Sequence, residues 1–129
     1  MMTKMHVYYE GNFRTRCVGH DGKNEIKTDA PKDRGGKGEF FSPTDLLAVA
    51  LGTCVLTVMG LAADQLKVDI TGIRLEVEKT TTMTIHIYCP RSFDAETQHK
   101  LELAGSRCPV HQSLHPNLKQ EFFFHWGEA

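Results

Sequence analysis

The chain has 129 residues, of which 15 are basic and 16 acidic, so its formal net charge is −1. This balance excludes the strongly basic surface with which proteins hold nucleic acid or an anionic membrane, and we expect neither as a partner. The length predicts a single domain, 1–129. A domain this small often gains by pairing with a second copy, so we expect a homodimer.

The opening segment, MMTKMHVYYEGNF, has neither the apolar run nor the small-residue cleavage site of a secretory signal, which predicts a cytoplasmic location. In a reducing compartment the four cysteines should be free thiols. They are Cys17, Cys54, Cys89 and Cys108. Any disulfide among them would then be transient chemistry and not a structural cross-link.

Residues 5–29 alternate polar and apolar side chains, with turn-forming pairs at Gly11-Asn12 and Asp21-Gly22. This pattern predicts three short antiparallel strands. The segment 30–38 is rich in glycine, proline and charge, which favours a mobile surface loop over any regular element. This loop carries Arg34.

A helix is predicted to begin at Pro43, with Ser42 as its N-cap and Asp45 in its first turn. Residues 46–63 carry no charge, a length at which a transmembrane span has to be weighed. The acidic residues at both ends, the internal glycines and the lack of aromatic or basic anchors argue against a membrane. We expect a helix buried in a globular core and covered partly by a second subunit.

Period-two alternation over 70–78 and 82–89 predicts a hairpin. Asp94 should cap a helix that ends near Gly105, and Cys108-Pro109 should open another short helix. An aromatic strand over 121–126 closes the chain. Strands, a long helix, more strands and further helices make an α+β fold, without regular βαβ alternation.

Two cysteines are candidates for chemistry. Cys54 lies mid-helix on an apolar face with Leu47, Ala50, Val58 and Leu61, where a cysteine is usually an inert core residue. Cys108 is predicted at a helix N-cap, where backbone N–H groups and the helix dipole favour the thiolate. An unreactive cap residue is the alternative for Cys108. Cys17 and Cys89 end strands without an activating neighbour, so we expect structural or incidental roles for them.

Cys108, His111 and His115 form a C-x2-H-x3-H run, a spacing that could bring metal ligands to one side of a helix. Pro116 interrupts this run and no second cysteine pair supplies further ligands, so we expect no metal. No phosphate-binding glycine loop, nucleophile elbow or basic aromatic patch occurs either. We therefore expect no cofactor.

The sequence resembles the OsmC/Ohr family, that of osmotically inducible protein C and organic hydroperoxide resistance protein. Three features carry the resemblance: the glycine-rich loop leading into Ser42-Pro43-Thr44-Asp45-Leu46-Leu47, the cysteine of Leu51-Gly52-Thr53-Cys54, and the segment Cys108-Pro109-Val110-His111. Each motif is short, but their order and spacing span nearly the whole chain.

The resemblance implies an OsmC-like fold, in which antiparallel sheets surround long central helices in an intertwined dimer. It implies that Cys54 attacks the O–O bond of a hydroperoxide and that Cys108 resolves it by forming a disulfide, with a small or protein dithiol as reductant. The family stabilises the thiolate with an arginine. Arg34 is placed like the arginine of the osmotically inducible branch, and Arg14 and Arg16 are the reserve candidates.

One position departs from the family pattern. The hydroperoxide-resistance branch has a glutamate directly after the helix-opening proline, which holds the arginine, and here that position is Thr44. Asp45 is one residue later and is expected to cap its own helix. The departure favours an OsmC-like subgroup and leaves two rivals to a peroxidase: a non-catalytic redox-sensing or ligand-binding protein, and a structural dimer with inert thiols.

Overall fold

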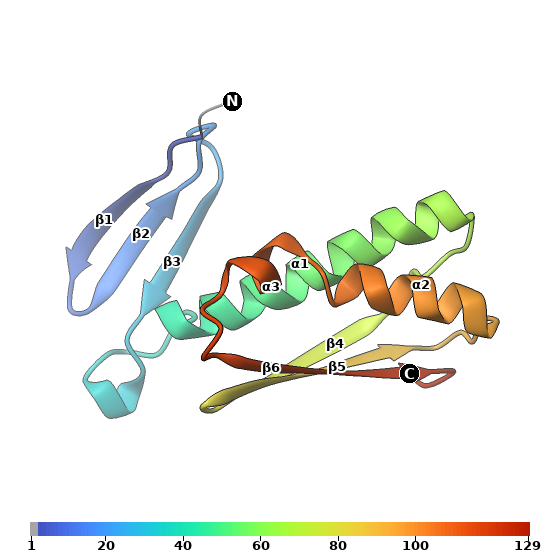
Figure 1. The fold of residues 1–129 in the computed structure, drawn as a ribbon. Coiled ribbons are helices and arrows are strands. Elements are labelled where there is room, and N and C mark those ends of the chain that lie inside the picture. The colour runs from blue at the N-terminus through green and yellow to red at the C-terminus, as the bar shows by residue number, and fades with distance from the viewer. Residues whose placement is uncertain (1–2) are drawn as a thin grey trace. The chain divides into compact units, whose positions relative to one another are not determined.

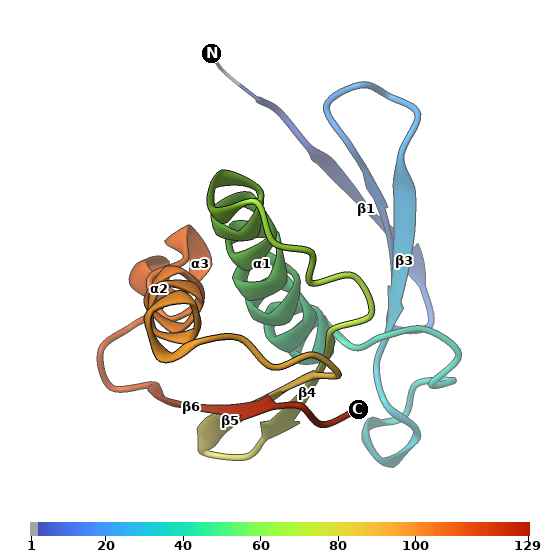
Figure 2. The same ribbon diagram turned by 90° about the vertical axis from the view of Figure 1, so that its right-hand side faces the viewer.

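The computed structural model describes residues 3–129. The chain forms two compact units, Met1–Leu47 and Ala48–Ala129, and each is described by itself. Figures 1 and 2 show small sheets together with one long helix and two shorter ones. The predicted α+β class is confirmed.

The first unit contains an antiparallel sheet in the order β1-β2-β3. Its strands are β1 (His6–Gly11), β2 (Arg14–Val18) and β3 (Glu25–Asp29), so the three predicted strands are confirmed. The first turn lies one residue later than expected, because Asn12 and Phe13 are the residues between the strands, both with positive φ. Gly11 also has a positive φ, at the irregularity in register between Tyr9 and Gly11.

The loop after β3 is more ordered than its composition suggested. It contains a 3₁₀ helix, η1 (Lys32–Arg34), so the expectation of no regular element was wrong. The backbone folds back on itself here: Gly36 N–H donates to the carbonyl of Pro31, and Gly38 N–H donates to that of Ala30. A Cβ at Gly36 would lie 1.9 Å from the Ala30 carbonyl oxygen, so this close approach requires glycine.

Helix α1 (Pro43–Leu66) begins where the sequence predicts. The Asp45 N–H donates to Ser42 Oγ at 3.1 Å and the Ser42 N–H donates to Asp45 Oδ2 at 3.0 Å. This reciprocal pair is a capping box with aspartate in place of glutamate. It confirms that Asp45 caps its own helix.

The second unit has a three-stranded sheet in the order β4-β5-β6. Strands β4 (Arg74–Lys79) and β5 (Thr82–Cys89) form the predicted hairpin, although β4 starts four residues later than expected. Strand β6 (Lys119–Trp126) starts two residues earlier and pairs parallel with β5. Between β5 and β6 lie α2 (Ala95–Gly105), capped by Asp94 as predicted, and α3 (Pro109–Ser113).

The core of the second unit lies between one face of this sheet and the helices, which Figure 2 shows on the same side of the sheet. Helix α1 contributes one face to this core, and strand β5 contributes every second residue. The buried residues of these two elements in the core are Ala48, Leu51, Val55, Met59, Ala63, Met83, Ile85 and Ile87. Leu101 of α2 completes the contact from the other helix.

The helix α1 was expected to be covered partly by a second subunit, and the single chain leaves part of its surface exposed. Leu61 is 63% exposed and Val49 is 38% exposed. By length and composition α1 could cross a membrane, a test that the core helix of a soluble protein also passes. Because α1 packs in the core of the second unit, we interpret it as a core helix and not as a membrane span.

Candidate active site

The two candidate thiols of the second unit come together. Cys54 lies in the middle of α1, and Cys108 is the N-cap residue of α3. Cys54 packs against the core cluster to which Cys108 belongs, and its proximity raises the pKa of the Cys108 thiol. Both cysteines are free thiols in this structure. Residues 54 positions apart in the sequence thus meet at the buried end of the short helix.

Cys108 does not have the environment that its N-cap position suggested. Its Sγ accepts a hydrogen bond from the His111 N–H at 3.3 Å, as an N-cap side chain should. The residue is nevertheless 0% exposed, and burial raises the pKa of the Cys108 thiol above its ordinary value. Desolvation outweighs the hydrogen bond from His111, and the neighbouring Cys54 raises the pKa further. The environment of Cys108 therefore favours the protonated thiol over the thiolate.

Cys54 lies beside the core and not inside it. The buried face of α1 carries Leu51 and Val55, and Cys54 packs against the core cluster while keeping part of its surface exposed. The neighbours predicted from the sequence pattern include Leu61, which is mostly exposed. The apolar face assigned to Cys54 is thus the less buried side of the helix.

The short helix α3 is anchored to β6 by His111. Its Nδ1 lies 2.6 Å from Gln120 Oε1, and its ring meets Phe122 edge-on at 5.3 Å between ring centres. The His115 Nδ1 accepts a hydrogen bond from the Asn117 N–H instead. Within residues 3–129 no three His, Cys, Asp or Glu side chains are placed to hold a metal ion.

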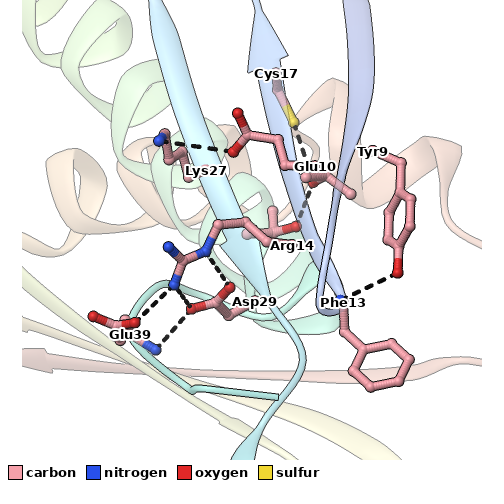
Figure 3. Close-up of polar contacts among 10 residues, drawn as sticks. Tyr9, Glu10, Phe13, Arg14, Cys17, Lys27, Asp29 and Glu39 are labelled. Carbon is pink, nitrogen blue, oxygen red and sulfur yellow. Dashed lines mark hydrogen bonds and ion pairs between the residues drawn. The ribbon is translucent and has the colours of Figure 1, made fainter. Parts of the chain in front are cut away.

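In the first unit, Arg14 is held by two carboxylates (Figure 3). Its Nε donates to Asp29 Oδ1 and its Nη2 to Asp29 Oδ2, each at 2.7 Å, and Nη2 also donates to Glu39 Oε1 at 2.9 Å. Asp29 is 1% exposed, and the hydrogen bonds from Arg14 lower the pKa of Asp29 to about 2. The same bonds raise the pKa of Arg14. The cluster of one cation and two anions is net negative.

The other two arginines differ from Arg14. Arg16 makes longer ion pairs, 3.7 Å to Glu10 and 3.5 Å to Glu25. Arg34 is the last residue of η1, and in the described part of the chain its guanidinium forms no hydrogen bond or ion pair. All three belong to the first unit, whereas both thiols belong to the second. A role for any of them at the thiols remains a prediction.

The family of this chain follows from comparison with known proteins. Residues 36–122 match the model of the OsmC-like protein family, which is more than half of the chain. The chain belongs to the OsmC-like protein family. This membership confirms the resemblance carried by the proline-capped helix, Cys54 and the Cys108 segment.

Solved structures agree with this assignment to the OsmC-like family. A protein of Psychrobacter arcticus 273-4, named for an osmotic stress induced and detoxification response, is 39% identical over 97% of both chains, with a TM-score of 0.91. An organic hydroperoxide resistance protein OsmC of Legionella pneumophila is 16% identical over 97% of both chains, with a TM-score of 0.72. OhrB of Bacillus subtilis is 16% identical, covering 96% of this chain and 98% of its own, with a TM-score of 0.64.

The last two similarities show the OsmC-like fold alone, since their identities are low. Among curated proteins none matches this chain significantly.

Sequence reasoning missed the carboxylates that hold Arg14. The Arg14–Asp29 pair could have been predicted from the strand register, because these residues lie opposite each other on β2 and β3. The contact of Glu39 with Arg14 could not be predicted in this way, since Glu39 follows the folded loop after η1 and lies outside the strands. Gln120, which holds His111, was likewise missed because the parallel pairing of β6 with β5 is a long-range feature.

Proposed function

We propose that this protein is a thiol-dependent peroxidase that reduces organic or inorganic hydroperoxides through Cys54 and Cys108. The observation that carries the proposal is that Cys54 packs against the core cluster containing Cys108, with Cys54 partly exposed and Cys108 buried. In this proposal a peroxide reaches Cys54, and the neighbouring Cys108 thiol reacts with its oxidation product. The hydroperoxide-resistance names of several relatives with this fold support the same chemistry.

The chemistry needs only the two sulfurs and a reductant. The Cys54 thiolate attacks one peroxide oxygen, the O–O bond breaks, and an alcohol or water leaves. The resulting Cys54 sulfenic acid condenses with the Cys108 thiol, which releases water and forms the disulfide. A small or protein dithiol then returns both thiols by exchange. The nearby Cys108 limits over-oxidation of Cys54.

Arg34 remains the leading candidate for the cation that stabilises the Cys54 thiolate. A thiolate is best stabilised by a guanidinium whose charge is not already neutralised. Arg14 is rigidly positioned, but Asp29 and Glu39 together outweigh its charge. Replacing each arginine by glutamine tests the two candidates. Arg34→Gln should slow Cys54 oxidation, because it removes the proposed activating cation. Arg14→Gln should have the larger effect only if Arg14 is the activating cation instead.

We also propose that the protein works in the cytoplasm as a homodimer in which residues 1–129 form one OsmC-like domain per subunit. The exposed apolar side chains of α1, such as Val49 and Leu61, support a partner chain on that face. Sedimentation velocity measures this directly. A dimer is expected at micromolar concentration, and a monomer at all concentrations would contradict it.

The peroxidase proposal is tested by steady-state peroxide consumption with a dithiol reductant. Cys54→Ser should abolish consumption, because serine cannot be oxidised by a hydroperoxide. Cys17→Ser is the matched control, since Cys17 lies on β2 in the other unit, and it should consume peroxide like wild type. Consumption by Cys54→Ser at the wild-type rate would refute the assignment.

The second candidate is a redox-sensing protein that reacts with peroxide but does not cycle. Thr44, at the position where the hydroperoxide-resistance branch has a glutamate, favours this candidate. The raised pKa of the Cys108 thiol favours it as well, because it lowers the thiolate fraction. Stopped-flow oxidation of Cys54 followed by addition of a dithiol distinguishes the two. A peroxidase returns to the reduced state within the turnover time, whereas a sensor stays oxidised.

A further inference from the structure

The outer face of the sheet in the second unit carries a cluster of aromatic rings. Side chains alternate between the two faces of a strand, and Met83, Ile85 and Ile87 of β5 point into the core. His86 and Tyr88, which alternate with them, therefore point to the opposite face, away from the helices of this unit (Figure 2). This face is not the side of α1 for which a partner subunit is proposed.

Strand β6 adds two further rings to the cluster. Phe123 and His125 are the register partners of His86 and Tyr88 in the parallel pair of strands. The rings lie nearly parallel, with 5.0 Å between the centres of His86 and Phe123 and 4.6 Å between those of Tyr88 and His125. Phe123 is 43% exposed and the His125 side chain is 29% exposed, so solvent reaches the cluster in this unit.

The two histidines of the cluster direct ring nitrogens at each other. His86 Nδ1 lies 3.1 Å from His125 Nε2. Two nitrogens that bind one Zn²⁺ at about 2.0–2.1 Å, with a tetrahedral angle between them, lie about 3.3 Å apart. The observed distance is close to this separation, so a small rotation of the two rings suffices to admit an ion. A hydrogen bond between the rings is the alternative account of the same distance.

A carboxylate favours the metal-binding tautomer of one of these rings. Glu128 Oε2 lies 3.5 Å from Nδ1 of His125, the ring nitrogen other than the one near His86. A carboxylate in this position keeps the proton of His125 on Nδ1 and leaves the lone pair of Nε2 directed at His86. Histidines that bind metal ions almost always have such a partner on their second nitrogen. This contact is a second observation, separate from the distance between the two histidines.

The charged groups around the two histidines are compatible with a cation. The Arg74 guanidinium lies over the Tyr88 ring, 4.2 Å from its centre, and it is paired with Glu76, so its charge is compensated. Glu128 supplies a negative charge beside His125. A divalent cation between the two imidazoles would therefore meet lone pairs and a carboxylate, with the nearby positive charge already neutralised.

We propose that His86 Nδ1 and His125 Nε2 bind a divalent transition metal ion of the Zn²⁺ class, which links β5 to β6 on the outer face of the sheet. Imidazole nitrogens are ligands that suit Zn²⁺ and its neighbours. Two side chains are fewer than the three or four of a resident zinc, so water completes the coordination and the ion exchanges with solvent. Binding requires His86 to carry its proton on Nε2, so the neutral pair changes tautomer without releasing a proton. The site does not involve Cys54 or Cys108 and is independent of the proposed peroxidase function.

The test is a titration of the full-length, ¹⁵N-labelled chain with ZnCl₂. Long-range ¹H–¹⁵N correlation spectra of the histidine rings report which nitrogen binds the ion. Zn²⁺ should shift the signals of His86 Nδ1 and His125 Nε2, and it should leave those of His99, an exposed histidine of α2, unchanged. Zinc held by the cysteine thiols, with the His86 and His125 signals unmoved, would overturn the proposal.

Substitutions measured by isothermal titration calorimetry with ZnCl₂ complete the test. His86→Phe and His125→Phe keep an aromatic ring in the cluster but remove the ligand nitrogen. Loss of a group that merely orients a ligand costs about 10–100-fold in metal affinity, so each variant should bind Zn²⁺ at least about tenfold more weakly. Tyr88→Phe is the matched control, because it keeps both nitrogens, and it should bind Zn²⁺ like wild type. Unchanged affinity in both histidine variants would overturn the proposal and leave the 3.1 Å contact as a hydrogen bond.

Discussion

Leu51 of helix α1 offers a quantitative test of the core against which Cys54 packs. It is 0% exposed and packs in the cluster that joins α1 to β5 and α2, one helical turn before Cys54. Truncation to alanine removes three carbon atoms, which at about 0.8 kcal/mol each costs about 2.4 kcal/mol of transfer free energy. The cavity left in a close-packed core adds to this, so Leu51→Ala should lower the free energy of unfolding by about 3 to 4 kcal/mol.

Urea denaturation followed by circular dichroism measures this loss, and Leu51→Met is the matched control at the same position. Methionine nearly conserves the side-chain volume, so its cost should stay below about 1.5 kcal/mol. A loss below about 1 kcal/mol for Leu51→Ala would refute the reasoning, because it would mean that this face of α1 is not held in a rigid core.

Two further predictions concern the first unit. Asp29→Asn removes the carboxylate whose folded-state pKa is lowered to about 2 by Arg14, so the variant should be less stable than wild type above the ordinary aspartate pKa of 3.8. This stability difference should shrink as the pH falls from about 4 to about 2, as measured by thermal melts across pH; a pH-independent difference would contradict it. Gly36→Ala should destabilise the protein in the same melts, because its Cβ would lie 1.9 Å from the Ala30 carbonyl oxygen, and an unchanged melting temperature would contradict that close approach.

The elements predicted correctly from the sequence are those specified by short-range chemistry. The Ser42–Asp45 capping box, the Asp94 cap and the proline after Cys108 each fix a helix start within a few residues. Alternating side chains likewise fixed the β4–β5 hairpin. Their free energies depend on neighbours in sequence, which is why periodicity and caps suffice to find them.

The features that could not be predicted depend on distant neighbours. The N-cap position of Cys108 suggested a stabilised thiolate, but the core built by other elements buries it and raises the pKa of its thiol. The proximity of Cys54 and Cys108 was expected only through the family resemblance, since two strands and a helix lie between them in the sequence. Glu39 reaches Arg14 because the loop before it is folded, whereas the composition of that loop predicted no regular element.

Mass spectrometry of the protein after one equivalent of an organic hydroperoxide tests the central claim most directly. The account predicts loss of two hydrogens from the intact chain and a single cross-linked peptide pair joining Cys54 to Cys108, reversed by a dithiol. A chain whose Cys54 and Cys108 both remain alkylatable after the peroxide has been consumed, or a cross-link that instead joins Cys17 or Cys89, would contradict it.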